Sequence, residues 1–293
     1  MKSLRRFSIA LAMVAVAVFN LDEVNAQDRR EYKELTYASV NGKDLRLDVY
    51  TPGKAGSPFL VVWVHGGAWS GGSKESPPMH FVESGFALAS LDFRPSTEAR
   101  FPGQVHEIKA AIRFLRAEAS KYGYRADRIA ISGASSGAHL AALVGTTNGV
   151  KELEGRVGGH FEQPSSVQAI VSYYGASNLT TILAQSTPYG VNMRVPALER
   201  LLGAKPDAVA DLAKLASPVF HVTAGDPPLL LFHGDQDPQM PINQSHELQG
   251  AYEKQGLKAE FVVVHGAAHG GPAFFESKRA SMAAKFLTEV LGR

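Results

Sequence analysis

The feature that most constrains the fold of this chain is a strand, turn and helix pattern at residues 129–140. Apolar residues 129–131 lead into Gly133-Ala134-Ser135-Ser136-Gly137, and a helical pattern of small residues follows at once. A residue at the apex of such a turn takes a strained backbone conformation, which is tolerated only where its neighbours lack bulk. The glycines at 133 and 137 satisfy that condition. The G-x-S-x-G spacing therefore predicts a nucleophile elbow that exposes the hydroxyl of Ser135.

The first 26 residues differ in character from the rest of the chain. Lys2, Arg5 and Arg6 form a basic start, residues 9–19 are an uninterrupted apolar run, and small residues follow at 24–26. This order predicts a secretory signal peptide over 1–26, because the apolar run is too short to span a membrane. We therefore expect a secreted or periplasmic protein whose mature chain, residues 27–293, has no membrane span.

The composition excludes several classes of site. The 293 residues are 45% hydrophobic and 20% charged, as in ordinary globular proteins, and they include no cysteine. Disulfides, thiolate metal sites and a cysteine nucleophile are thereby excluded. The basic residues form no run that would indicate a nucleic-acid partner. The histidines show no paired ligand spacing, so we expect neither a metal nor another cofactor. The oligomeric state is left open.

Strand and helix patterns alternate along the mature chain. Residues 34–40 and 45–50 flank Asn41-Gly42, which predicts an antiparallel hairpin. Further strands are expected at 59–64, 86–93, 129–134, 167–174, 229–232 and 260–264, and helices at 101–122, 136–144, 242–254 and 272–291. This alternation predicts an α/β fold whose mostly parallel sheet is covered by helices on both faces, with the hairpin at one edge.

One connection is too long to be a bare loop in a compact domain. Residues 175–228 lie between two expected strands and contain helical patches at 195–202 and 208–215. We expect this insertion to form a small helical cap or side wall.

Reactive residues follow several of the expected strands, at the edge of the sheet where ligands of such folds bind. The segment His65-Gly66-Gly67-Ala68-Trp69 follows the strand at 59–64. Glycines allow backbone N–H groups to approach a substrate, and such donors stabilise the oxyanion formed at an attacked carbonyl. We expect the amides of Gly67, Ala68 and Ser136 to form an oxyanion hole.

A carboxylate and an imidazole follow the last two strands. Asp235 and Asp237 both come after the strand at 229–232, and either one is also typical of an Asx turn, so position separates them only weakly. His265 ends the last strand and His269 follows four residues later. Placement in a glycine-rich loop favours His269 as the base that reaches Ser135, and His265 as a structural residue.

The order serine, acid, histidine resembles that of the α/β-hydrolase superfamily. The segments quoted above resemble in particular secreted esterases of the bifunctional feruloyl and acetylxylan esterase type, and they are similar to hormone-sensitive-lipase-like carboxylesterases. The resemblance covers nearly all of the mature chain. It implies a triad of Ser135, Asp237 and His269, in which the acid is Asp237 rather than Asp235, and it makes His65 a scaffold residue.

The chain departs from those families at three positions. Met240 stands where valine is usual in the acid segment, and Ala268 stands where glycine is usual before the histidine. Ala68 replaces a third glycine in the oxyanion segment, which points away from strict hormone-sensitive-lipase membership.

The expected function is that of a secreted serine carboxylesterase that acts through an acyl-enzyme. The resemblance suggests acetyl or feruloyl esters of plant polysaccharide, or a small-molecule ester, as substrate. An aromatic acyl pocket would be lined by Trp69, Tyr173, Tyr174 and Tyr189, unless these side chains belong to the core.

Three alternatives remain open at this point. The H-G-G-x-W segment is also a signature of kynurenine formamidases, although tryptophan catabolism is cytoplasmic and the expected signal peptide argues against it. A serine peptidase would need a gating domain of which the sequence has no sign. A catalytically silent binding protein would not need nucleophile, acid, base and oxyanion segment together.

Overall fold

The computed structural model describes residues 29–53 and 56–292, so the predicted signal peptide lies outside the described residues. The strands of the sheet are β1 Arg30–Val40, β2 Lys43–Thr51, β3 Phe59–Val64, β4 Ala87–Leu91, β5 Arg125–Ala134, β6 Ala169–Tyr173, β7 Leu229–Gly234 and β8 Ala259–Val264. They form one eight-stranded sheet in the order β1-β2-β4-β3-β5-β6-β7-β8. Strand β1 pairs antiparallel with β2, and β2 pairs antiparallel with β4, whereas the other neighbours are parallel. The predicted α/β-hydrolase type of sheet, with its antiparallel edge hairpin, is confirmed.

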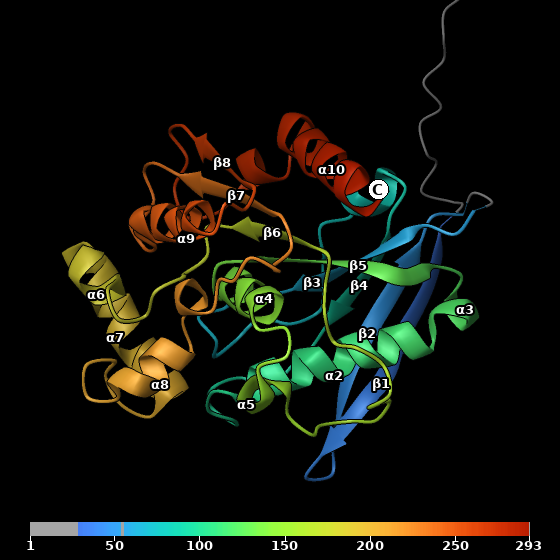
Figure 1. Ribbon diagram of the computed structural model, residues 1–293, viewed down its shortest axis with the longest axis horizontal. Coiled ribbons are helices and arrows are strands. Elements are labelled where there is room, and N and C mark those ends of the chain that lie inside the picture. The colour runs from blue at the N-terminus through green and yellow to red at the C-terminus, as the bar shows by residue number, and fades with distance from the viewer. Residues whose placement is uncertain (1–28, 54–55, 293) are drawn as a thin grey trace, which may run out of the picture.

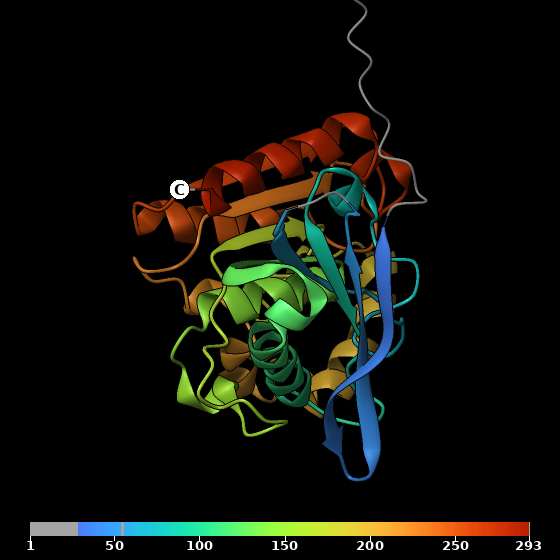
Figure 2. The ribbon, with the colours of Figure 1, turned by 90° about the vertical axis from the view of Figure 1, so that its right-hand side faces the viewer.

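Helices cover both faces of the sheet (Figure 1). The helices are α1 His80–Glu83, α2 Gly103–Ala117, α3 Ala119–Tyr122, α4 Ser136–Thr146, α5 Lys151–Glu154, α6 Ile182–Gln185, α7 Pro188–Leu202, α8 Ala210–Leu215, α9 Asn243–Lys254 and α10 Ser277–Leu291, with 3₁₀ turns η2 Pro218–Phe220 and η3 Pro272–Phe274. Figure 2 shows α10 on one side of the sheet and α2 with α4 on the other. None of the helices in the described part of the chain is both long and apolar enough to cross a membrane.

The central strands bury apolar side chains on both faces, as the continuous apolar run at 59–64 predicts. Val62 and Val64 of β3 pack with the buried residues of α2 and α4. Val61 and Trp63 pack on the opposite face, with the buried residues of α1 and α10. The two core layers therefore hold β3 and β5 rigidly at the centre of the sheet.

The insertion between β6 and β7 contains α6, α7, α8 and η2. Helix α7 is longer than the patch predicted at 195–202, and it begins at Pro188 behind the N-cap Thr187. Gly190 and Pro196 obscure the helical pattern in the sequence because both residue types are poor helix formers. The hydroxyl of Thr187 accepts from the N–H of Gly190 at 3.0 Å, and this cap fixes the start of the helix.

The elbow after β5 is closed by backbone contacts that leave no room for side chains on its glycines. Ser135 takes φ 55° and ψ −123°, a conformation that L-residues rarely adopt. A Cβ on Gly133 would lie 2.5 Å from the carbonyl carbon of Gly137 and 2.8 Å from the carbonyl oxygen of Val64. A Cβ on Gly137 would collide with that same Val64 oxygen and with the carbonyl of His65. The elbow can form only with glycine at both positions.

We predict that Gly137→Ala destabilises the fold by about 4 kcal/mol or more, because the added Cβ meets backbone that cannot move aside. Gly250→Ala is a matched control in helix α9, where an added Cβ meets nothing within 4 Å. That control should raise stability by about 0.5–1 kcal/mol, since alanine is the better helix former. Urea unfolding monitored by circular dichroism measures both changes. Equal effects of the two substitutions would contradict the close packing at the elbow.

Candidate active site

The structure brings Ser135, Asp237 and His269 together at the carboxyl edge of the sheet. Ser135 lies between β5 and α4, Asp237 follows β7, and His269 follows β8. The Oγ of Ser135 is 2.8 Å from Nε2 of His269. Nδ1 of the same ring is 2.6 Å from Oδ2 of Asp237. This is the geometry of a nucleophile, a base and an orienting acid in one hydrogen-bonded line.

Asp237 is held as a carboxylate by the groups around it. Its Oδ1 accepts from the backbone N–H groups of Gln239 and Met240, each at 2.8 Å. The buried Nε2 of His233 lies 3.4 Å from its Oδ2. Burial alone would raise the pKa of Asp237, but the hydrogen bonds from His233 and His269 outweigh burial and hold this pKa well below its usual range.

Asp235 makes different contacts, which separate it from Asp237. Its carboxylate accepts from Nδ1 of His265 at 2.8 Å and from the N–H of Gly266 at 2.8 Å. The N–H of Gln236 donates to the carbonyl of Ala267 at 3.0 Å. These bonds fasten the loop that carries His269 to the loop that carries Asp237. Of the two aspartates, only Asp237 has a hydrogen bond to His269 in the described structure.

Tyr174, the residue that follows β6, packs against His269. Its ring meets that of His269 edge to face, with centroids 4.9 Å apart and an interplanar angle of 65°. Its backbone takes φ 44°, which is unusual for a bulky residue. Burial, followed by the nearby charge of Asp237, raises the pKa of the Tyr174 phenol, so it stays neutral. The ring of Tyr174 therefore packs on the imidazole as a neutral group.

The segment predicted to form an oxyanion hole lies against the elbow. A Cβ on Gly66 would come within 2.9 Å of the carbonyl oxygen of Ala134 and 3.3 Å of the Cβ of Ser135. Gly67 and Ala68 follow with φ 121° and 51°. In the described structure their N–H groups donate to no protein acceptor. Ser136 is the first residue of α4, where helix N–H groups lack an intrahelical acceptor.

The residues around this segment explain why it holds its shape. Nδ1 of His65 donates to the carbonyl of Gly66 at 2.7 Å, and the ring stacks on Phe93 with centroids 4.5 Å apart. Trp69 is fully buried and donates from Nε1 to Nδ1 of His139 at 3.0 Å. Nε2 of His139 donates in turn to a carbonyl of the insertion, that of Ala216, at 2.7 Å. The sequence pattern gives no signal for His139, because its partners come from distant segments.

The four aromatic residues expected in an acyl pocket occupy different places. Trp69 and Tyr173 are fully buried in the core, and Tyr173 stacks on Phe232 with centroids 5.1 Å apart. Tyr174 lies against His269, whereas Tyr189 is exposed on α7. The structure therefore brings only Tyr174 of these four into contact with a proposed catalytic side chain.

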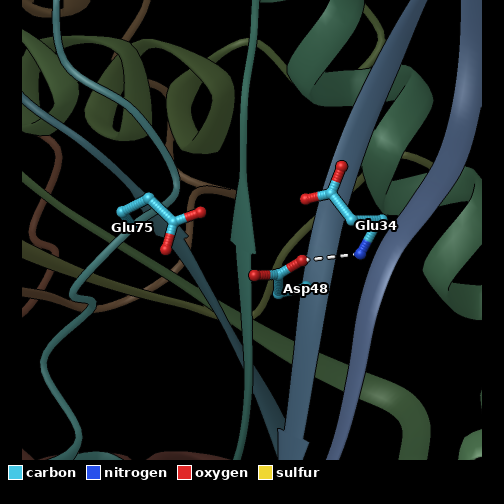
Figure 3. A group of neighbouring side chains, drawn as sticks. All are labelled: Glu34, Asp48 and Glu75. Atoms are coloured by element: carbon cyan, nitrogen blue, oxygen red, sulfur yellow. Dashed lines mark hydrogen bonds between the residues drawn. The ribbon is translucent and has the colours of Figure 1, made fainter.

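A separate group of carboxylates lies near the hairpin. Glu34, Asp48 and Glu75 place oxygens within 4.8 Å of one another, and the N–H of Glu34 donates to Asp48 at 2.8 Å (Figure 3). The buried ammonium of Lys74 contacts all three carboxylates. Burial would lower the pKa of Lys74, but bonds to Glu34 and Asp48 outweigh it and raise this pKa. The ammonium thus takes the position that a metal ion would need.

A family model identifies the chain more closely. The model for the family described as BD-FAE matches residues 47–252, which is more than half of the chain. The chain belongs to the BD-FAE family. The matched range contains the proposed oxyanion segment, the elbow and Asp237, while His269 lies beyond its end. The predicted resemblance to α/β-hydrolase esterases is confirmed.

Several known proteins that are similar to this member of the BD-FAE family are named as esterases. A truncated carbohydrate esterase from gut microbiota superimposes with a TM-score of 0.82 at 31% identity, over 90% of this chain and 97% of that one. Thermogutta terrifontis esterase 2, phosphorylated by paraoxon, gives 0.71 at 28% identity, over 88% and 94%. Esterase LipQ of Mycobacterium tuberculosis is 28% identical over 94% of this chain and 66% of its own length. The chain spans about half to two thirds of the length of the curated relatives it matches.

We predict that Lys74→Met destabilises the fold by about 3 kcal/mol, because it leaves the buried Asp48 without its main partner. Millimolar Ca²⁺ should restore part of the melting temperature of this variant, since the carboxylate oxygens are already close together. The wild type should show no such response to Ca²⁺ or to EDTA. Lys33→Met, at a half-exposed lysine beside the same Asp48, is the control and should have a smaller effect. A wild-type protein stabilised by Ca²⁺ would contradict this description of the cluster.

Proposed function

We propose that this chain is a serine carboxylic ester hydrolase with Ser135 as nucleophile, His269 as general base and Asp237 as orienting acid. One observation carries the proposal: the imidazole of His269 bridges Ser135 at 2.8 Å and Asp237 at 2.6 Å. Membership of the BD-FAE family and the esterase names of its relatives support the same reaction class.

The reaction begins with a proton transfer along this line. Asp237 accepts from Nδ1–H of His269, so the lone pair of Nε2 faces the hydroxyl of Ser135. As the Oγ of Ser135 attacks the ester carbonyl, its proton passes to Nε2. The imidazolium then protonates the leaving alcohol, and an acyl-enzyme remains on Ser135. Water, activated by the same imidazole, hydrolyses this ester and restores the serine.

The negative oxygen formed in each step needs preorganised donors. We assign this role to the N–H groups of Gly67, Ala68 and Ser136, which lie beside the elbow and donate to no acceptor among the described residues. Each such donor contributes about 3–4 kcal/mol to stabilisation of the transition state. Because the donors are fixed by the backbone, they need not reorganise during the reaction.

For the natural substrate we propose acetyl or feruloyl esters of plant polysaccharide, hydrolysed outside the cytoplasm after removal of the signal peptide expected at 1–26. A structural neighbour that is named a carbohydrate esterase supports an ester attached to a carbohydrate. The exposed aromatic ring of Tyr189 on α7 offers a surface of the kind on which a sugar or a feruloyl ring stacks.

We predict that the wild type hydrolyses p-nitrophenyl acetate and releases acetate or ferulate from substituted xylan fragments. Ser135→Ala should abolish turnover, and it should also abolish the mass added by a fluorophosphonate probe. N-formylkynurenine and a dipeptidyl amide complete the substrate panel. If the protein turned over only the formyl amide, the result would contradict the esterase proposal and indicate a formamidase. A folded wild type that the probe does not label would indicate a binding protein instead.

The two aspartates provide a matched pair of variants. Asp237→Asn should lower kcat by about four orders of magnitude, because the amide no longer orients the imidazole or stabilises its charged form. Asp235→Asn should lower kcat by about tenfold or less, because Asp235 fastens the loop without contacting His269. Steady-state kinetics on p-nitrophenyl acetate compares the two. A larger loss of kcat for Asp235→Asn than for Asp237→Asn would show that Asp237 is not the acid.

A further inference from the structure

The insertion contacts the loop of residues 235–241, here termed the acid loop, although it contributes no residue to the proposed triad. The Oγ–H of Thr187, the N-cap of α7, donates to the carbonyl of Pro238 at 3.0 Å. Farther along the same helix, Arg194 donates from Nε and Nη2 to the carbonyl of Gln239, at 2.9 and 2.6 Å. One helix therefore holds two successive carbonyls of the acid loop.

The same loop residues hold the carboxylate on their other side. The N–H of Gln239 donates to Oδ1 of Asp237 at 2.8 Å while its carbonyl accepts from Arg194. A shift of Gln239 would thus move the acid, and with it the imidazole bonded to Asp237 at 2.6 Å. Hydrogen bonds connect α7 to the proposed nucleophile through three intermediate residues.

Arg194 is a buried cation whose described contacts include no carboxylate. Its side chain is 3% exposed, and in the described structure no carboxylate lies within ion-pair distance of it. Burial lowers the pKa of Arg194 to about 10, and the negative charge of Asp237 opposes this change. Burying a cation costs free energy that an apolar side chain of similar size would not. We therefore expect the charge of Arg194 to contribute an interaction that an apolar side chain could not.

We propose that Arg194 is a positioning residue, which fixes the acid loop through Gln239 and supplies a buried positive charge that acts on Asp237. The inference rests on the proposed triad and deepens it. The other titratable groups that face Asp237 are His233 from β7, His269 after β8 and Tyr174 after β6. Arg194 is the guanidinium of this set, and a guanidinium carries its positive charge permanently near neutral pH.

The test compares Arg194→Met, Arg194→Lys and the control Arg200→Met, which alters an exposed arginine of the same helix. For Arg194→Met we expect kcat to fall about 10- to 100-fold, with KM within about twofold of the wild-type value. A displaced acid reduces stabilisation of the transition state more than it reduces the affinity for substrate. The acid limb of kcat/KM against pH should move up by about half a unit, since loss of a positive charge favours the protonated base. Arg194→Lys should keep the limb in place, and Arg200→Met should match the wild type.

A merely structural role would lower stability and leave the acid limb unmoved, and that result would overturn the proposal. A limb that moves equally in Arg194→Lys and Arg194→Met would also overturn it. If Arg194→Met fails to fold, Thr187→Val loosens the acid loop without changing charge, and a wild-type kcat for that variant would count against the coupling. A wild-type protein that is inactive and is not labelled by the fluorophosphonate probe would instead contradict the proposed function itself.

Discussion

The structure depends on the close approach of three backbone segments: the end of β3, the end of β5 and the start of α4. Gly133 and Gly137 allow this approach, and a Cβ at either position would meet the carbonyl of Val64. Ser135 is thereby forced to φ 55°, a strain of about 1–3 kcal/mol that an isolated turn would relieve by changing shape. The N–H of Ser135, which donates to the carbonyl of Tyr173 at 2.9 Å, and the two packed core layers prevent that relaxation.

Once the elbow is fixed, the remaining groups need only be brought to the same edge of the sheet. Parallel pairing of β5, β6, β7 and β8 places their carboxyl ends side by side. The loops after β7 and β8 are then fastened together, because Asp235 accepts from His265 and from Gly266. Asp237, which takes no part in this fastening, accepts from Nδ1 of His269. The H-G-D-x-D pattern therefore holds two carboxylates with different tasks, one joining the loops and one facing the imidazole.

The succession of strands and helices along the chain and the elbow at Ser135 could be predicted, because apolar periodicity and local turn chemistry are visible in the sequence. Position alone separated Asp235 from Asp237 only weakly, and the choice of Asp237 depended on the family resemblance. The full length of α7 could not, since Gly190 and Pro196 interrupt the helical pattern and tertiary packing overrides their low propensity. Arg194 and His139 were missed for a related reason. Each acts on a partner that folding alone brings near, so no spacing in the sequence marks either residue.

The contacts of Asp237 also bear on where the proton rests during the proposed reaction. The carboxylate receives two backbone N–H bonds and the imidazole of His269, and the positive charge of Arg194 acts on it from α7. Hydrogen bonds from His233, His269 and the N–H of Met240 outweigh burial and hold the pKa of Asp237 so low that a proton released by Ser135 is more stable on the imidazole than on the acid. The acid then stabilises the imidazolium without taking its proton. Under the role proposed for Arg194, part of that stabilisation comes from α7 of the insertion, outside the sheet that positions the triad.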